Sequence, residues 1–487
     1  MLTMRNSTAE LRTAISPVLT RSMLYFLRLL KEYRVLSVLS VPINFRLSST
    51  QRWMKEQYGP IFTIHLGMNK AVVLTGLESI KEALVEGADK FSDRAHLPIF
   101  NAIQRGNGVF FSSGEMWRTT RRFTISSMKN LGMGKKHIED KIVEELQFLT
   151  NKIESYAGQQ FKLREFACGP TNITFAMIFG NRFDYSDPIY IQLLDLIDEI
   201  VVLLGSPYLQ LFNMYPMLAM FMKTHKIILK NIDKICDVLK TDIQAKRNKM
   251  DERTNKDSLF NDANVLATVL DLVMAGTETT SSTLQWGILL MMKYPEVQKK
   301  VQKEIHSVLE SGRLPQFEDR NAMPYTHAVI HEVQRFANLL PNVPHATSTD
   351  TYFKGYHIPK GTTVIPLLTS VLHGKHHWET PLQFNPNHFL DAEGKFVKNE
   401  AFLPFSTGRR LCLGESLAKM ELFIFFTGLL QKFNFTPPHG MEVVNPAVLA
   451  SPPHIIVNPA HGPLHRNFGL LPHAAANCPT PPPAACS

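Results

Sequence analysis

Residues 405–414 read FSTGRRLCLG, and one cysteine, Cys412, lies near the end of this stretch. Glycines on both sides of Cys412 allow the backbone to approach a flat cofactor closely, and an apolar helical pattern begins immediately afterwards. Backbone N–H groups and the positive end of a helix stabilise a negatively charged sulfur. The stretch therefore predicts Cys412 as a thiolate ligand, with Phe405 shielding the sulfur from water and Arg410 reaching an anionic edge of the cofactor.

The pattern FxxGxRxCxG is long, and it favours a cysteine-ligated haem iron, because thiolate ligation promotes O–O bond cleavage. The alternative is a loop cysteine that merely precedes a helix. The other cysteines form no CxxC pair, so neither a disulfide framework nor a structural zinc site is expected. They are Cys168, Cys236, Cys478 and Cys486. Cys168 and Cys236 have helical contexts and are expected to be buried as small hydrophobic residues.

The composition is that of a large globular protein. The chain has 487 residues, 44% of them hydrophobic, and a formal net charge of +9. A positive charge favours anionic partners such as acidic proteins or a negatively charged membrane face. No run of Lys and Arg is long enough to favour nucleic acid, so none is expected as a partner.

Three segments are expected along the chain: an atypical N-terminal segment at 1–52, one haem-thiolate domain at 53–458, and a disordered Pro- and Ala-rich tail at 459–487. Residues 22–45 are apolar but are interrupted by charges, and a spanning helix needs about 20 mostly apolar residues. We therefore expect neither a transmembrane helix nor a cleaved signal peptide. Two alternatives stay open for this segment, an amphipathic helix at the membrane interface and a terminal helix that packs on the core.

The secondary structure is expected to be mainly helical. Residues 59–76 predict two strands around a Gly-Met-Asn turn, and residues 77 to about 340 predict mostly helices. Residues 264–293 lack proline and predict one helix of roughly 45 Å, which Pro295 separates from the next. The polar stretch 246–262 predicts a loop, residues 350–370 predict strands, and 415–432 predict a last apolar helix.

Three further phrases carry a resemblance to a known family. They are AGTETTSSTLQW at 275–286, MPYTHAVIHEVQRF at 323–336 and FNPNHFLD at 384–391. With FxxGxRxCxG, they make the chain similar to the cytochrome P450 superfamily from about Trp53 to Pro438. It is most similar to the vertebrate microsomal family 2, and the sequence HAT after NVP resembles a fish subfamily. The resemblance implies a mainly α fold, a helical prism with a small β-rich lobe and a buried haem.

The resemblance also implies roles for paired residues on helices. Glu332 and Arg335 are three residues apart and so share a helical face. The two residues by themselves favour an exposed ion pair on the surface of a helix. The resemblance implies instead a buried ion pair, completed by residues 385–388. Trp117 and Arg121, four apart, correspond to the pair that holds the haem propionates; the alternative is an amphipathic helix with a buried tryptophan. His345 stands where many members place an arginine for a propionate.

Residues 275–280, AGTETT, place poor helix formers in the middle of a long helix. Such a local conflict often marks a functional site. By resemblance, Glu278 and Thr279 are the acid–alcohol pair that delivers protons during the reaction with dioxygen. Ala275 lies one turn before Thr279, on the same face, which is expected to meet the haem. The alternative is a helix whose threonine hydroxyls bond back to its own carbonyl groups.

The implied function is monooxygenation: one oxygen atom of O2 enters a lipophilic small molecule, such as a fatty acid or a foreign compound (xenobiotic). The implied cofactors are haem b and, through a reductase, NADPH. The implied partners are NADPH-cytochrome P450 reductase, cytochrome b5 and the cytoplasmic face of the endoplasmic reticulum membrane. A cluster of basic side chains is expected to form either a docking surface for an acidic electron donor or a solvated face: Arg118, Arg122, Lys129, Lys135 and Lys136.

The sequence leaves two alternative functions open. The first alternative is a haem-binding protein that is catalytically impaired, because 1–52, the short 246–264 region and the region after Pro438 depart from the family pattern. The second is a haem-thiolate isomerase that needs no external electrons, which Glu278 and Thr279 disfavour. Product formation in the presence of a reductase distinguishes a monooxygenase from a catalytically impaired haem-binding protein.

Overall fold

A computed structural model describes residues 57–247, 261–310, 312–437 and 454–459. The expected N-terminal segment 1–52 lies outside the described residues. So do most of the expected loop at 246–262 and of the expected tail at 459–487.

Helices dominate the described chain, which confirms the mainly α expectation. The α-helices are α3 (Leu77–Lys81), α4 (Pro98–Gln104), α5 (Gly114–Asn130), α6 (Lys136–Glu154), α7 (Cys168–Phe179), α8 (Pro188–Leu204), α9 (Pro207–Met214), α10 (Thr224–Arg247), α11 (Asp262–Lys293), α12 (Pro295–Val308), α13 (Pro324–Ala337), α14 (Thr369–Leu372) and α15 (Glu415–Lys432). Short helical turns of other types are η2 (Glu82–Glu86), η3 (Leu163–Ala167), η4 (Pro216–Phe221), η5 (Phe317–Asn321), η6 (Pro386–Phe389) and η7 (Gly408–Arg410).

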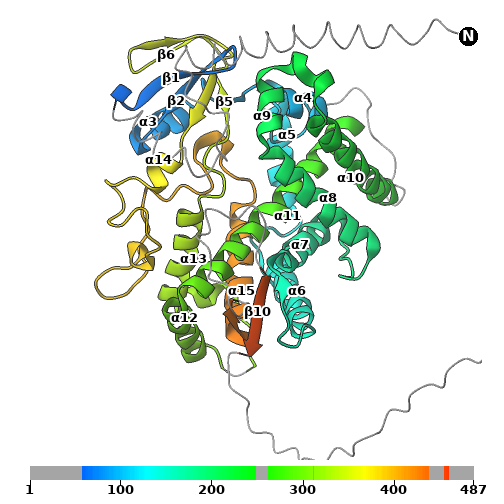
Figure 1. Ribbon diagram of the computed structural model, residues 1–487, viewed down its shortest axis with the longest axis vertical. Coiled ribbons are helices and arrows are strands. Elements are labelled where there is room, and N and C mark those ends of the chain that lie inside the picture. The colour runs from blue at the N-terminus through cyan, green and yellow to red at the C-terminus, as the bar shows by residue number, and fades with distance from the viewer. Residues whose placement is uncertain (1–56, 248–260, 311, 438–453, 460–487) are drawn as a thin grey trace, which may run out of the picture.

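The strands form a small β-rich lobe and a short sheet among the helices. One sheet has the order β1 (Ile61–Leu66), β2 (Asn69–Leu74), β8 (Thr363–Pro366), β5 (His345–Ala346) and β3 (Asp93–Arg94). A hairpin joins β6 (Thr351–Phe353) and β7 (Tyr356–Ile358), and a third sheet has the order β4 (Phe161–Lys162), β10 (His454–Pro459) and β9 (Phe433–Thr436). Figure 1 shows β1, β2, β5 and β6 gathered with α3 and α14 on one side, and most helices on the other.

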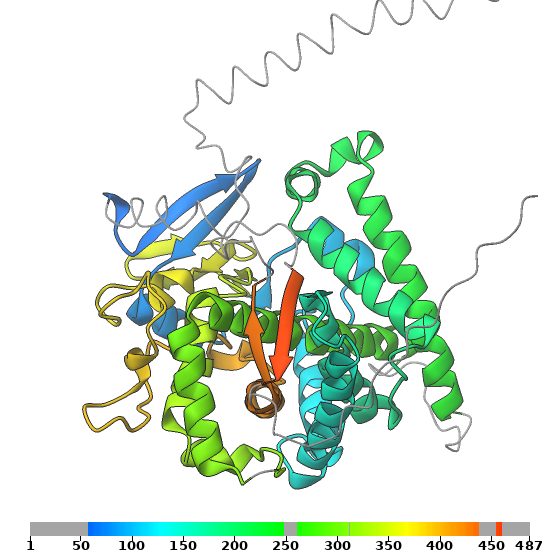
Figure 2. The same ribbon diagram turned by 60° about the horizontal axis from the view of Figure 1, so that its bottom comes forward.

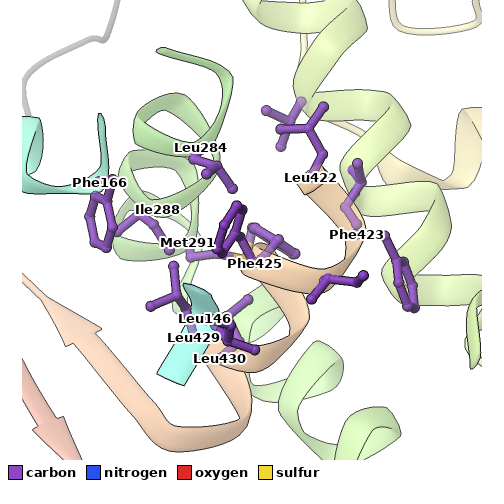
Figure 3. Close-up of a cluster of buried hydrophobic side chains, with 14 of the residues drawn as sticks. Leu146, Phe166, Leu284, Ile288, Met291, Leu422, Phe423, Phe425, Leu429 and Leu430 are labelled. Atoms are coloured by element: carbon purple, nitrogen blue, oxygen red, sulfur yellow. The ribbon is translucent and has the colours of Figure 1, made fainter. Parts of the chain in front are cut away.

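The core of the helical part lies between α6, α11 and α15. Its centre is made of large apolar side chains from these helices, among them Leu146, Leu284, Ile288, Phe425 and Leu429, each at most 1% exposed. Figure 3 shows these side chains converging between the helices. Because α15 directly follows the Cys412 loop, its burial fixes the loop against the centre of the molecule.

The expected boundaries agree closely with the structure. The long helix begins at Asp262, two residues before the expected Asn264, because the Asn261 side chain accepts a hydrogen bond from the Asn264 amide and caps the helix. Pro295 opens α12, and α15 covers 415–432 as expected. Near the expected end of the domain, Pro459 pairs with Phe433 in the strands β10 and β9, which Figure 2 shows side by side.

Glu332 and Arg335 form the buried ion pair that the resemblance implied. Both side chains have 0% exposure. Arg335 Nε and Nη2 each donate to a different oxygen of the Glu332 carboxylate over 2.7 Å. The Asn385 amide donates to Glu332 over 2.8 Å, and His388 Nδ1 lies 3.2 Å from the same carboxylate. The expected network with residues 385–388 is therefore present.

Arg335 also holds a stretch of irregular chain. Its Nη1 donates to the carbonyl oxygens of Leu372 and Pro381, both over 2.8 Å, and its Nη2 donates to that of Gln383 over 2.9 Å. Leu372 ends α14, and Pro381 and Gln383 lie in the irregular chain after it. Arg335 therefore supplies hydrogen-bond partners to carbonyl groups that regular secondary structure does not satisfy.

We expect Glu332→Ala to prevent accumulation of folded protein. Removing one partner of a buried pair costs about 3–5 kcal/mol, a large share of the roughly 5–15 kcal/mol by which a typical domain is stable. Soluble yield and thermal unfolding measure the effect. Glu400→Ala is the control, because Glu400 pairs with Lys81 over 3.0 Å at 85% exposure, and a surface pair contributes only about 0–1 kcal/mol. A Glu332→Ala protein as stable as the Glu400→Ala protein would contradict this account.

Candidate active site

The Cys412 loop is a tight turn between η7 and α15. The Cys412 amide donates to the Phe405 carbonyl oxygen over 3.1 Å, and the Leu411 amide donates to that of Gly408 over 3.1 Å. Gly408 has a φ of 75°, and a Cβ there would overlap the carbonyl oxygen of Leu84. Only glycine fits this position, because the backbone is left-handed and touches a neighbouring chain segment.

The Cys412 side chain is exposed, yet protein surrounds it closely enough that burial raises the pKa of its thiol. A side chain can be accessible to solvent and also surrounded by protein when it faces a space enclosed by the chain. The Gly414 amide and Arg121 lower this pKa, and Glu415 raises it. The expected N–H stabilisation is therefore present but weaker than the effect of burial. A bound metal cation is what would deprotonate such a thiol fully.

Arg94, Arg121 and Arg410 form a cluster of positive charge beside this loop, in which Arg410 is buried and the other two are partly buried. Burial and the nearby Arg121 lower the pKa of Arg94 to about 9. Burial, Arg94 and Arg121 lower the pKa of Arg410 to about 8. Within the described residues, none of the three forms an ion pair with a carboxylate. Buried like charges without a counter-ion are unfavourable, so the cluster fits an anionic ligand.

Two buried donors in this region also lack a partner. In the described chain, neither the indole Nε1 of Trp117 nor Nη1 of Arg94 has a hydrogen-bond partner. Buried polar groups are nearly always hydrogen-bonded, and both N–H types suit a carboxylate. These donors and the cation cluster fit the two propionates of the haem that the sequence resemblance implied.

Arg121 and Arg410 already have protein partners. Arg121 Nη2 donates to the Leu411 carbonyl oxygen over 2.5 Å, next to Cys412. Arg410 donates to the carbonyl oxygens of Ser92 over 2.7 Å and Ser112 over 2.6 Å, and its guanidinium lies 3.8 Å from the centre of the Trp117 ring. Arg410 therefore orders the surrounding chain, and its positive charge adds to the cluster.

His345 lies in β5 and is 3% exposed. Its Nδ1 lies 2.7 Å from the Phe91 carbonyl oxygen, which can only accept, so Nδ1 carries the proton. Burial and Arg94 lower the pKa of His345 to about 3, so the ring is neutral and Nε2 is an acceptor. It can donate to a carboxylate only when protonated, and a carboxylate nearby would favour that state.

Arg94 was missed by the sequence reasoning. It lies in the two-residue strand β3, which pairs with β5 and so brings Arg94 opposite His345. No spacing in the sequence links these residues, which are far apart along the chain. Only the sheet pairing reveals that they share a site.

The middle of α11 has one open face. Ala275 is exposed and Thr279, one turn later, is partly buried, although the helix runs through the molecule. The Thr279 hydroxyl donates to the Ala275 carbonyl oxygen over 2.7 Å. This is the back-bonding that the alternative reading expected, and it leaves the hydroxyl oxygen free to accept a hydrogen bond.

Glu278 is not joined to Thr279. Its carboxylate accepts from the Ser282 hydroxyl over 2.6 Å. Burial raises the pKa of Glu278, with Asp198 adding to the rise and Ser282 opposing it. The structure therefore places the expected acid and alcohol on one segment without a direct hydrogen bond between them.

Two other features of this helix have packing reasons. A Cβ on Gly276 would overlap the Thr174 hydroxyl, so the glycine permits close approach of α7. Beneath the helix, Glu421 of α15 is 2% exposed and hydrogen-bonds Thr280, and burial raises its pKa to about 8. Sequence reasoning missed Glu421, because a lone acid in an apolar helix gives no signal of its partner.

Comparisons with known proteins agree with the geometry. The family described as Cytochrome P450 matches residues 33–459. The chain is similar to cytochrome P450 2W1 of Homo sapiens, with 49% identity over 90% of each chain. It is similar to cytochrome P450 2K6 of Danio rerio, with 45% identity over 80% of this chain and 81% of the relative. It is similar to cytochrome P450 2B19 of Mus musculus, with 43% identity over 80% of this chain and 84% of the relative. These relatives confirm the resemblance to family 2, including fish members.

We expect Trp117→Phe to release haem faster while the protein stays folded. The change keeps an aromatic ring beside Arg410 and removes the unpartnered N–H. Loss of one hydrogen bond to a charged group should accelerate haem transfer to an apoprotein acceptor about tenfold. Trp378→Phe is the matched control, because its buried N–H donates to Val371 over 2.9 Å, away from the cation cluster. Equal haem release from both variants would rule out Trp117 as a cofactor contact.

Proposed function

The chain belongs to the cytochrome P450 family and is a P450 monooxygenase, and we propose that it oxidises lipophilic small molecules such as fatty acids and xenobiotics. Electrons come from NADPH through NADPH-cytochrome P450 reductase, with cytochrome b5 as a second donor. The observation that carries the proposal is the exposed Cys412 thiol beside a buried cluster of arginines without a counter-ion. A single ligand fits both features if its metal ion binds the thiol and its two carboxylates bind the arginines.

Haem b is held by both parts of the site in this proposal. Cys412 would ligate the iron, and Trp117, Arg94 and Arg121 would receive the propionates, with Arg410 and His345 adding to the same site. When bound, the haem supplies the dioxygen-activating chemistry. Phe405 and Gly408 fix the cysteine turn, since the Phe405 carbonyl oxygen accepts the Cys412 amide and Gly408 lies against Leu84.

Thr279 and Glu278 handle protons in this proposal. With its own proton directed at Ala275, the Thr279 Oγ1 accepts a hydrogen bond and holds a water molecule at the open face of α11. Burial raises the pKa of Glu278, which favours the protonated carboxyl and makes it a source of protons for that water. Because Glu278 is turned toward Ser282, side-chain rotation or a water bridge must connect it to Thr279.

The electron donor docks on a basic face of α5. Arg118, Arg122 and Lys129 are exposed, and their spacing puts them on one side of the helix. The turn at Gly134, between Lys129 and the exposed Lys135 and Lys136, lies against Ser416 at the start of α15, close to Cys412 along the chain. A positive surface beside the cysteine loop attracts an acidic protein. Steep inhibition of reductase-supported turnover by salt tests this surface.

The protein acts at the cytoplasmic face of the endoplasmic reticulum membrane. Large apolar side chains are strongly exposed on α9 and η4: Tyr208 at 68%, Met217 and Met220 at 74% and Phe221 at 75%. Met68, 80% exposed, lies in the β1–β2 turn whose Gly67 contacts Met214. Such a patch suits the lipid interface. In the described residues, no helix is long and apolar enough to cross a bilayer. Flotation of Phe221→Ser protein with liposomes tests the patch.

We expect Cys412→Ala to abolish the red-shifted Soret band of the reduced carbon monoxide complex. Thiolate ligation produces that band, and no other cysteine lies in this loop. Cys236→Ala, in α10, is the control and should keep the band. Retention of the band by Cys412→Ala would overturn the haem-thiolate assignment. A band without product formation in the presence of a reductase would instead favour the catalytically impaired alternative.

We expect Thr279→Ala to uncouple the reaction. The haem spectrum should be intact and NADPH consumption should continue, because neither depends on the hydroxyl. Product per NADPH should fall, with peroxide released, since positioned proton delivery is typically worth about 10²–10⁴-fold. Thr279→Ser keeps the hydroxyl and should retain coupling, whereas Glu278→Gln should slow turnover by limiting proton supply. Unchanged coupling in Thr279→Ala would exclude the hydroxyl from this role.

A further inference from the structure

Two histidines on α13 lie together against a group of phenylalanine rings. His327 and His331 are one helical turn apart, and the centres of their rings lie 4.5 Å from each other. His327 stacks on Phe396, with ring centres 3.9 Å apart. The His331 ring lies 4.7 Å from that of Phe396 and 4.8 Å from that of Phe402. Both imidazoles are partly buried and fill space between α13 and this chain segment as aromatic rings do.

The segment that packs on the two histidines leads to the Cys412 loop. Phe396 and Phe402 lie on the largely irregular chain between η6 and η7. Three residues after Phe402, the Phe405 carbonyl oxygen accepts the Cys412 amide over 3.1 Å. The amino group of Lys419 on α15 lies 5.7 Å from the centre of the Phe405 ring. The histidine pair therefore supports the chain that holds the cysteine turn.

The charged side chains around the pair are cations. Arg320 of η5 acts on His327, and Lys398 and Lys419 act on both rings. Within the part of the chain that the structure describes, no carboxylate is among the charged groups that act on either ring. A protonated imidazole here would lose contact with water and would meet these cations. Both effects favour the neutral rings.

The hydrogen bonding and the burial of the rings agree with a neutral pair. His331 Nδ1 donates to the His327 carbonyl oxygen over 2.9 Å. Burial and the nearby cations lower the pKa of His327 to about 4. Burial and the neighbouring His327 lower the pKa of His331 to about 3. An unperturbed histidine has a pKa of about 6.5, so the closed structure excludes protons that an opened chain would bind.

We propose that His327 and His331 form an acid-sensitive anchor for the chain that leads to the Cys412 loop. While they are neutral, the two rings hold Phe396 and Phe402 against α13. When the pair gains a proton, this contact opens and the Cys412 loop loses its support. The proposal goes beyond the proposed function, and it rests on that function only where the haem is used to report on the loop.

Proton linkage sets the pH range of the anchor. Above about pH 6.5 both the closed and the opened forms are neutral, so the contact has its full strength. As the pH falls from about 6.5 toward about 4, the opened chain takes up protons that the closed one excludes, and opening becomes more favourable. A histidine paired with a carboxylate behaves in the opposite way, since its contact strengthens as the pH falls.

The first test is His327→Phe, which keeps an aromatic ring against Phe396 and cannot take up a proton. Hydrogen exchange of the ferric holoprotein is followed in peptides covering 389–405. Wild type and variant should exchange alike at about pH 7.5. At about pH 5 the wild type should exchange about tenfold faster than the variant, because a proton bound only by the opened form shifts the equilibrium by about that factor per pH unit below 6.5. His137→Phe, at an exposed position of α6, is the control and should match the wild type.

A second variant keeps both histidines and changes their surroundings. Lys398 is exposed, and Lys398→Glu replaces a cation near the rings by a carboxylate, which favours the protonated pair in the closed form. This variant should show part of the reduction in acid-induced exchange that His327→Phe shows. It tests the proposal even if His327→Phe yields no holoprotein.

The haem provides a second measurement. The rate at which the thiolate-type carbon monoxide band is lost at about pH 5 should fall in His327→Phe by about the same factor as the exchange rate, about tenfold. The acidity of the thiol itself is common to wild type and variant, so the comparison isolates the histidine. His137→Phe should lose the band as fast as the wild type.

The same pH dependence of exchange in the wild type, His327→Phe and Lys398→Glu would overturn the proposal. Faster exchange of His327→Phe by one factor at both pH values would also overturn it, since the ring would then act by packing alone. Failure of the proposed function gives a different result, namely wild-type protein without the thiolate-type band even at neutral pH. The exchange measurement can still be made on that protein.

Discussion

The buried pair of Glu332 and Arg335 is the interaction on which the site depends. An arginine without access to water must satisfy all its donors inside the protein, and Arg335 does so with one carboxylate and three backbone carbonyl groups. Those carbonyls belong to the end of α14 and to the irregular chain between α14 and η6. That chain continues through the 390s to the Cys412 loop, so the ion pair on α13 indirectly positions the cysteine. A hydrophobic replacement could fill the same volume but could not organise these carbonyls.

The described residues of the site carry an excess of positive charge that no carboxylate beside it balances. Arg94, Arg121 and Arg410 lie close together without carboxylate partners among the described residues, and burial lowers the pKa of each. Such an arrangement is unfavourable until an anion arrives, so part of the binding energy of an anionic cofactor comes from relieving this repulsion. Arg94 and Arg410 also order the loop before α5 through its carbonyl groups. Cofactor binding and the position of this loop are therefore physically connected.

The structure gives several residues around the site a local role that the sequence pattern does not indicate. Glycine in the interior of a helix suggests a functional position, but Gly276 permits close packing against Thr174. Thr279 bonds back to Ala275, as the structural alternative expected, and it still offers an acceptor to the open face. Arg410 stands beside the cofactor site as expected, yet its strongest hydrogen bonds go to backbone carbonyl groups.

The sequence alone determined the elements with strong local signals. Periodicity and prolines locate α11, α15 and the start of α12 to within two residues. The FxxGxRxCxG pattern singles out Cys412. These signals act over a few neighbouring residues. The tertiary structure alone decided which distant groups meet. The strand pairing that sets Arg94 opposite His345 joins segments that no local rule connects. So does the approach of Asp271 to the amides of Val109 and Phe110. Burial also depends on the whole fold. Because they are buried, Glu332 and Arg335 form a strong ion pair that holds neighbouring chain segments, and the arginines beside Cys412 favour an anionic ligand.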